Sequence, residues 1–217
     1  MDQMKEYEAD FDQMLFYLPL SGSTFKKVYY DDLLGRGVSK FVPADDLVVP
    51  YSATSLEDAE AIIHVIKISE NDLRKQQVNG FYTDIELAKP SAATDADKVT
   101  DKERELEGVT KTARAETLYT LLECHVNLDL EGFEDMSPDG EPTGIKLPYI
   151  VTIDETSSKI LSIRRNYKAE DPKKNKTQYF VHFKFLPGLG FYGFGLIHMI
   201  GGLSRTATSA LSLIHIW

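Results

Sequence analysis

The glycine run at residues 188–193 is the part of this sequence that comes closest to a known binding motif. Gly188, Gly190 and Gly193 fit the pattern G-x-G-x-x-G between a predicted strand and a predicted helix, where backbone N–H groups can hold a pyrophosphate. A dinucleotide site also needs a parallel βαβ unit and an acidic residue about 20 positions later, and the sequence offers neither. A strand-to-helix joint in which glycines relieve crowding is therefore favoured, with a small-ligand or nucleotide-binding enzyme as the alternative.

Cys124 and His125 are a second candidate, because a thiolate beside a base can act as a nucleophile. Adjacent residues of a strand point to opposite faces, so the two side chains cannot form the required hydrogen bond. We expect Cys124 to fill the core and His125 to lie at an edge or on the surface. The paired carboxylates at residues 31–32 and 45–46 are expected at solvated turn ends.

The sequence lacks the motifs of other common catalytic sites and of metal sites. The five histidines form neither H-x-H nor H-E-x-x-H, and the single cysteine has no partner at zinc-ligand spacing. The nucleophile motif G-x-S-x-G is absent. We predict no catalytic residue, no cofactor site and no metal site from these patterns.

Basic residues are concentrated toward the end of the chain. Residues 1–141 hold 14 Lys and Arg against 30 Asp and Glu, whereas residues 142–217 hold 10 against 4. An acidic bulk would repel free nucleic acid, but a local basic face remains compatible with DNA. The basic positions expected to face DNA or an acidic neighbour are Lys173, Lys174, Lys176 and Arg205.

Length and composition indicate one folded domain with an appended element. The 217 residues are 42% hydrophobic, which is enough for a substantial core, and the lone Cys124 excludes an intramolecular disulfide. The acidic N-terminus does not resemble a secretory signal, so synthesis in a cytosol is expected.

Residues 185–204 are uncharged and long enough to span a bilayer, but Pro187 and six glycines interrupt them. A membrane-associated module is a further alternative.

The first half of the chain predicts short strands and one helix. Strands are expected at residues 25–32, after a turn, and at 46–50, and a third within 52–69, which is rich in β-branched residues. Residues 69–80 predict a helix with Ser69 or Asn71 as its N-cap and Gly80 at its end. Residues 88–115 are polar and charged, and we expect an exposed, mobile insertion.

The second half predicts an antiparallel meander of four strands, at residues 116–130, 148–154, 160–167 and 178–186. In the last strand Tyr179, Val181, Phe183 and Phe185 alternate with Phe180, His182 and Lys184, which is typical of a strand with one buried face. The predicted fold class is therefore α+β, with short helices beside the meander.

A glycine-rich helix is expected to follow the meander. Its apolar residues recur at alternating spacings of four and three, which places them on one helical stripe: Leu196, Ile200, Leu203, Ala207, Ala210 and Ile214. Small residues make the helix thin, so that another backbone can approach closely. We predict two segments, a mixed domain at residues 1–187 and a glycine-rich joint with a helix at 188–217.

Several longer runs resemble the portal proteins, or head-to-tail connectors, of short-tailed double-stranded DNA bacteriophages. The resemblance rests on LPLSGSTFKKVYYDD, FVPADDLVVPYSATSLEDAEAIIH and NDLRKQQVNGFY, and then on ECHVNLDLEGFED, PYIVTIDETSSKILSIRRNY and FVHFKFLPGLGFYGFGLIHMIGGLSRTATSAL. It extends in order over most of residues 11–211 and is interrupted by the polar insertion.

The resemblance implies a non-enzymatic subunit of a ring, usually of twelve copies, at one vertex of a virion assembled in the host cytoplasm. Double-stranded DNA would pass through its channel, and its partners would be terminase, tail or head-completion proteins, capsid protein and scaffolding protein, with no membrane. Residues 1–187 would be the wing and 188–217 the start of the stem helix. Close helix packing between subunits would involve Gly193, Gly195, Gly201, Gly202, Ser204 and Thr208.

The same resemblance implies that this chain is a fragment, because the family's stem helix continues into further sections. The final residues, LSLIHIW, do not resemble a continuation of that helix. We expect them to be a sequencing or assembly artefact, which re-sequencing of the gene would test.

Overall fold

The computed structural model describes residues 4, 6–31, 34–88, 118–137 and 139–214. The insertion predicted at residues 88–115 therefore lies, apart from Ala88, outside the described residues. The chain divides into two compact units, one formed by Met1–Ile62 with Tyr167–Trp217 and the other by Ile63–Asn166. We describe each unit by itself. The glycine-rich segment and terminal helix predicted at residues 188–217 belong to the first unit.

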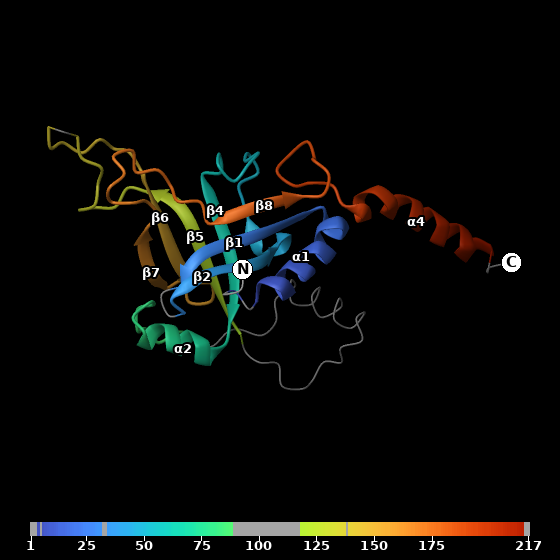
Figure 1. The fold of residues 1–217 in the computed structure, drawn as a ribbon, viewed down its shortest axis with the longest axis horizontal. Coiled ribbons are helices and arrows are strands. Elements are labelled where there is room, and N and C mark those ends of the chain that lie inside the picture. Colours follow the sequence, from blue (N-terminus) through green and yellow to red (C-terminus); the bar gives the residue numbers. More distant parts are fainter. Residues whose placement is uncertain (1–3, 5, 32–33, 89–117, 138, 215–217) are drawn as a thin grey trace. The chain divides into compact units, whose positions relative to one another are not determined.

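The first unit is built on a three-stranded antiparallel sheet with the order β2-β1-β8 (Figure 1). Its strands are β1 (Ser23–Asp31), β2 (Arg36–Pro43) and β8 (Phe180–Lys184). Phe25 of β1 pairs with Val42 on one side and with His182 on the other. The strand predicted at residues 25–32 corresponds to β1, whereas β2 was not predicted.

Helix α1 (Tyr7–Ser21) packs on one face of this sheet. Met14 is buried in the contact, and the ring centroids of Tyr17 and Phe41 lie 5.6 Å apart. Helix α1 has no counterpart among the predicted elements, because its acidic residues and Pro19 weaken the helical pattern.

The opposite face of the sheet contributes to the core of the first unit. The 3-10 turn η1 (Ala44–Asp46) and the two-residue strand β3 (Leu47–Val48) add to this core, so the strand predicted at 46–50 is shorter than expected. The buried apolar side chains are Phe25, Val42, Leu47, Ala53, Leu56, Ala59, Ile62, Phe180 and Phe191.

The second sheet has the strand order β3-β4-β5-β6-β7. Four of its strands are β4 (Ala61–Ile68), β5 (Tyr119–Leu128), β6 (Leu147–Asp154) and β7 (Ile160–Arg165). The antiparallel pairings of β5 with β6 and of β6 with β7 confirm three strands of the predicted meander.

The predicted place of the fourth strand in the meander is wrong. The strand predicted at residues 178–186 is β8, which pairs with β1 instead of β7. Its Phe180 is buried in the core of the first unit, beside Phe25. The polar loop before it is long enough to carry the chain into another sheet, and strand patterning alone does not specify which neighbour a strand pairs with.

Helix α2 (Glu70–Val78) confirms the predicted helix and its N-cap. The Ser69 hydroxyl accepts a hydrogen bond from the Asp72 N–H at 3.2 Å, and Gly80 follows the helix with a positive φ of 75°. Leu73 of α2 joins the apolar core of the second unit, which also contains Tyr82, Tyr119, Leu121 and Leu161.

In β8 Phe180 is buried and Val181 is 46% exposed, so the face that carries Phe180 turns toward the core. The prediction for the faces of β5 is wrong. In β5 His125 is buried and Cys124 is only half-buried, the reverse of the prediction. The reason in β5 is a buried polar pair, in which His125 Nε2 lies 2.8 Å from Glu123 Oε1, so that each side chain satisfies the other.

Candidate assembly surface

The terminal helix α4 (Leu196–Ile214) is exposed from Leu196 to Ser212. Every side chain from Leu196 to Ser212 is exposed, although several are large and apolar: Leu196, Ile197, Met199, Ile200, Leu203 and Leu211. Leu203 is 72% exposed. Most helices in proteins owe their stability to packing of an apolar face, and this face is uncovered in the part of the chain that the structure describes.

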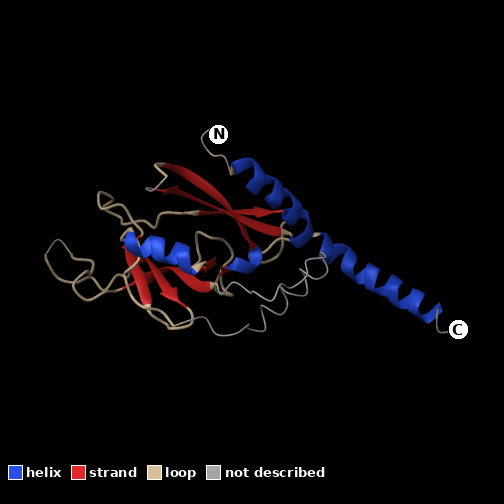
Figure 2. Cartoon of the chain, turned by 90° about the horizontal axis from the view of Figure 1, so that it is seen from below, coloured by secondary structure: helices blue, strands red, loops and turns tan. Residues whose placement is uncertain are grey.

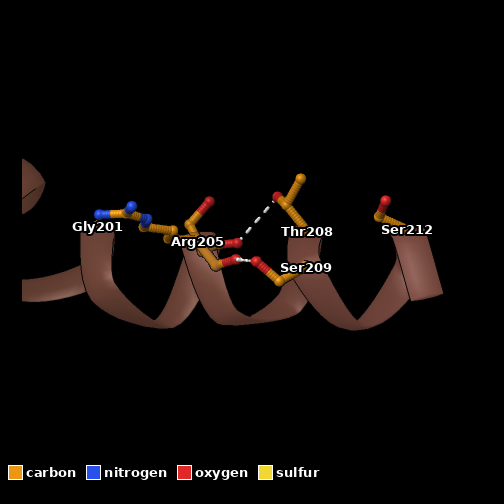
Figure 3. Close-up of a pocket in the computed structure, with 6 residues that line it drawn as sticks. Gly201, Arg205, Thr208, Ser209 and Ser212 are labelled. Carbon is orange, nitrogen blue, oxygen red and sulfur yellow. Dashed lines mark hydrogen bonds between the residues drawn. The ribbon is translucent and has the colours of Figure 1, made fainter.

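The two sides of α4 differ in chemistry. Because successive residues rotate by about 100°, Leu196, Ile200 and Leu203 share one side of the helix. The opposite side carries small residues and Arg205 (Figure 3). A shallow groove on this side is lined by Gly201, Ser204, Arg205, Thr208, Ser209 and Ser212.

Three of the hydroxyl side chains of α4, those of Thr206, Thr208 and Ser209, donate hydrogen bonds within the helix. Thr208 Oγ1 donates to the Ser204 carbonyl and Ser209 Oγ to the Arg205 carbonyl, both at 2.9 Å (Figure 3). Thr206 Oγ1 donates in the same way to Gly202 O at 3.0 Å. The small-residue side can therefore pack against another helix without leaving these hydroxyl protons unpaired.

The joint that precedes α4 packs tightly against the end of α1, and both views place these helix ends together (Figures 1 and 2). Gly22 has a φ of +88°, and a Cβ on it would lie 2.6 Å from the Gly193 carbonyl oxygen. A Cβ on Gly195 would lie 2.5 Å from the Gly22 nitrogen. These glycines allow backbones to meet, which agrees with the predicted crowded joint.

The structure consequently separates the glycines that were predicted to pack between subunits. Gly193 and Gly195 are buried, lie before α4, and contact backbone of their own chain. Gly201, Gly202, Ser204 and Thr208 are exposed on α4. For these four, packing between subunits stays a prediction.

A buried hydrogen-bond network fixes the same joint to the sheet. The Gly193 N–H donates to Ser23 Oγ at 2.7 Å, and Ser23 Oγ lies 3.1 Å from His182 Nε2. The His182 ring stacks with Phe25 and Phe191, at centroid distances of 4.4 and 4.8 Å. Burial lowers the pKa of His182 to about 4, with a further lowering from Lys184, so the imidazole is neutral at pH 7.

The glycine run is a closed loop in the structure. Leu186 and Phe194 form an isolated β-bridge, in which the Phe194 N–H donates to the Leu186 carbonyl at 2.8 Å. Since the Gly193 N–H is also engaged, neither of these two amides is available to a phosphate. This geometry lends no support to the nucleotide-binding alternative.

The four predicted basic positions do not form one surface. Lys176 Nζ donates to the carbonyls of Leu56 and Ala59 at 3.1 and 3.0 Å, and burial lowers its pKa. Lys176 is therefore a tether within the fold. Lys173 is exposed and Lys174 half-buried in one turn, whereas Arg205 lies on α4.

Two buried polar features were missed by sequence reasoning. One is the Glu123 and His125 pair, which the i, i+2 spacing on one strand face could have indicated. The other is Lys26, which is 5% exposed, with its ammonium 4.4 Å from the Tyr7 ring centroid and 5.3 Å from that of Phe11. Burial lowers the pKa of Lys26, and Asp10 acts in the opposite direction.

The described residues offer little for other kinds of site. Among them no group of three or more His, Cys, Asp or Glu side chains is placed to hold a metal ion. Across the same residues, no helix combines the length and apolar character needed to cross a membrane. Burial raises the pKa of the Cys124 thiol, which disfavours the reactive thiolate.

Comparison with protein-family models and with curated proteins finds no match to this chain.

Proposed function

We propose that this chain is part of a non-enzymatic subunit of a bacteriophage portal ring, which surrounds double-stranded DNA at one vertex of the capsid. The observation that carries the proposal is α4, a helix whose apolar side is exposed and whose opposite side is lined by small residues. Such a helix is suited to packing against copies of itself. The ordered resemblance over residues 11–211 adds support.

A ring requires that each subunit present two different surfaces to its two neighbours. Helix α4 has two such sides, with Leu203 on the apolar one and Gly201 on the small-residue one. The large side chains of one copy can enter the thin side of the next, and repetition around an axis closes the ring. The tight joint at Gly22 and Gly195 would hold every α4 at the same angle to its sheet.

In this proposal the protein has a structural role and catalyses no reaction. The ring forms a channel for DNA during packaging and ejection, and it presents surfaces to terminase and to tail or head-completion proteins. Arg205 on α4 and Lys173 on the loop before β8 are the exposed basic positions that could face DNA or a neighbouring acidic surface.

The proposal is tested on the subunit expressed from the complete gene, by mass photometry and electron microscopy. We expect rings for the natural subunit. Leu203→Asn on the apolar side and Gly201→Leu on the small side should each reduce ring formation, because each alters one partner of the same contact. Val78→Asn is the matched control, since Val78 is 74% exposed on α2. A subunit that stays monomeric at high concentration would refute the proposal.

A further inference from the structure

A groove of about 690 Å³ lies in the second unit, between helix α2 and the segment that follows it. One wall is formed by α2 and the other by residues 84–87, and Tyr119 at the start of β5 completes the lining. Small-molecule sites typically enclose about 300 to 1,000 Å³, so the groove can hold a small ligand. The residues that α2 contributes are Glu70, Asn71, Leu73, Arg74 and Gln77.

The two walls are held together by side-chain bonds. Gln77 is 8% exposed, and its Nε2 donates to the Ile85 carbonyl at 2.9 Å. Gln77 Oε1 accepts from Arg74 Nη1 at 3.2 Å, and Arg74 also forms an ion pair with Asp84 on the opposite wall. The groove is therefore a fixed feature of the fold, and its one cationic lining residue is already engaged.

Tyr119 brings a free hydroxyl group to the groove. The residue is only 6% exposed, because its ring packs in the core with Leu73, yet no described residue forms a hydrogen bond with its hydroxyl. Burial raises the pKa of Tyr119, and the carboxylates of Glu70 and Asp154 raise it further, so the hydroxyl is neutral at pH 7 and close to Glu70. Buried polar side chains are normally hydrogen-bonded, so this hydroxyl indicates a place for a ligand group.

The rest of the lining is acidic and apolar. Glu70 on α2 and Glu86 on the other wall are exposed, and neither makes an ion pair within the part of the chain that the structure describes. The nearby Lys159 ammonium donates to the backbone carbonyl of Glu86, at 2.8 Å. Leu73 and Leu87 supply apolar surface. A ligand that complements this lining carries ammonium groups on an aliphatic chain.

We propose that this groove binds a linear aliphatic polyamine. One ammonium group would lie beside Glu70 and donate to the Tyr119 hydroxyl, a second would lie beside Glu86, and the carbon chain between them would contact Leu73 and Leu87. A lysine side chain of a partner protein is a poorer occupant, because it has one ammonium group whereas each wall presents a carboxylate. The proposal goes beyond the ring and does not depend on it.

The test uses the full chain and putrescine, with binding measured by calorimetry in about 150 mM NaCl to screen diffuse attraction to the acidic protein. We expect putrescine to bind and a butanediol of the same chain length not to bind. Tyr119→Phe keeps the buried ring and removes only the free hydroxyl, so it should weaken binding roughly fivefold. Glu70→Gln should weaken binding by a similar factor. In carbon-13 NMR of labelled tyrosine, the signal that Tyr119→Phe removes should shift when putrescine is added.

Glu155→Gln is the matched control, because Glu155 is an exposed carboxylate of the same unit outside the groove. It should bind putrescine like the natural chain. The proposal would be overturned by absence of binding, by unchanged binding in Tyr119→Phe, or by equal weakening in Glu155→Gln and Glu70→Gln, which would show diffuse attraction. Tighter binding of a capped lysine amide than of putrescine would assign the groove to a partner's side chain instead. Ring formation is scored separately, so the two proposals can fail independently.

Discussion

At the scale of single residues, the joint between β8 and α4 depends on a histidine that must stay neutral. Ser23 Oγ accepts the Gly193 N–H at 2.7 Å and lies 3.1 Å from His182 Nε2, whose ring stacks with those of Phe25 and Phe191. Protonation would place a positive charge in this partly buried site, beside the rings of Phe25 and Phe191 and near Lys184. The network that fixes the joint is therefore sensitive to acid.

This sensitivity predicts a pH dependence of unfolding. Because the pKa of His182 is lowered to about 4 from 6.5, the unfolded chain binds the proton more readily between these values. The contribution of His182 is fully present above pH 6.5 and declines as pH falls toward 4, by about 2 to 3 kcal/mol. Urea unfolding at pH 7 and pH 4.5 should show a larger loss for the natural chain than for His182→Gln. Equal losses would contradict the assigned role.

The glycines at the joint and on α4 predict opposite responses to the same substitution. Gly195→Ala should destabilise the protein by about 3 kcal/mol, because a Cβ would meet backbone that cannot move aside. Gly201→Ala is the matched control, since nothing lies within 4 Å of the added Cβ. It should stabilise α4 by up to about 1 kcal/mol through higher helix propensity. Thermal unfolding of both variants checks the contrast, and equal destabilisation would refute it.

At the scale of elements, the lysine-rich loop before β8 is held by one of its lysines. Lys176 bonds two carbonyls of the segment that leads into β4, whereas Lys173 is exposed. The loop thus connects parts of the first unit that are more than a hundred residues apart in sequence. Its stability and its surface charge depend on different lysines.

Substitution by methionine separates these roles. Lys176→Met should lower the free energy of unfolding by about 2 kcal/mol, because two buried carbonyls lose their donor. Lys173→Met should change it by less than about 0.5 kcal/mol, as is usual for an exposed position. Chemical denaturation measures both. A neutral Lys176→Met would show that the tether contributes nothing to stability.

At the scale of the whole molecule, the charge distribution and the composition of α4 indicate which forces would drive association between subunits. Acidic residues dominate positions 1–141 and basic residues positions 142–217, yet α4 carries Arg205 as its single charged residue. Contacts made through α4 should therefore be driven by apolar burial.

Salt dependence tests this expectation. Between 50 and 500 mM NaCl, ring formation by the complete subunit should change by less than about threefold, because few ion pairs would be screened. Arg205→Ala should behave like the natural subunit in the same titration. Mass photometry across the salt series provides the measurement, and a steep loss of rings at high salt would show that charges hold the contact.

The sequence alone determined the features that depend on local chemistry. The Ser69 cap and Gly80 stop of α2, the turn-separated strands β5, β6 and β7, and the amphipathic terminal helix follow from neighbouring residues, whose preferences act over a few positions. The α+β class followed from the same patterns.

The tertiary structure alone decided which elements meet. It paired β8 with β1, buried the Glu123 and His125 pair, turned Lys176 inward, and brought Gly22 against Gly195. Each of these depends on residues distant in sequence whose polar groups satisfy one another, so no local pattern reports them.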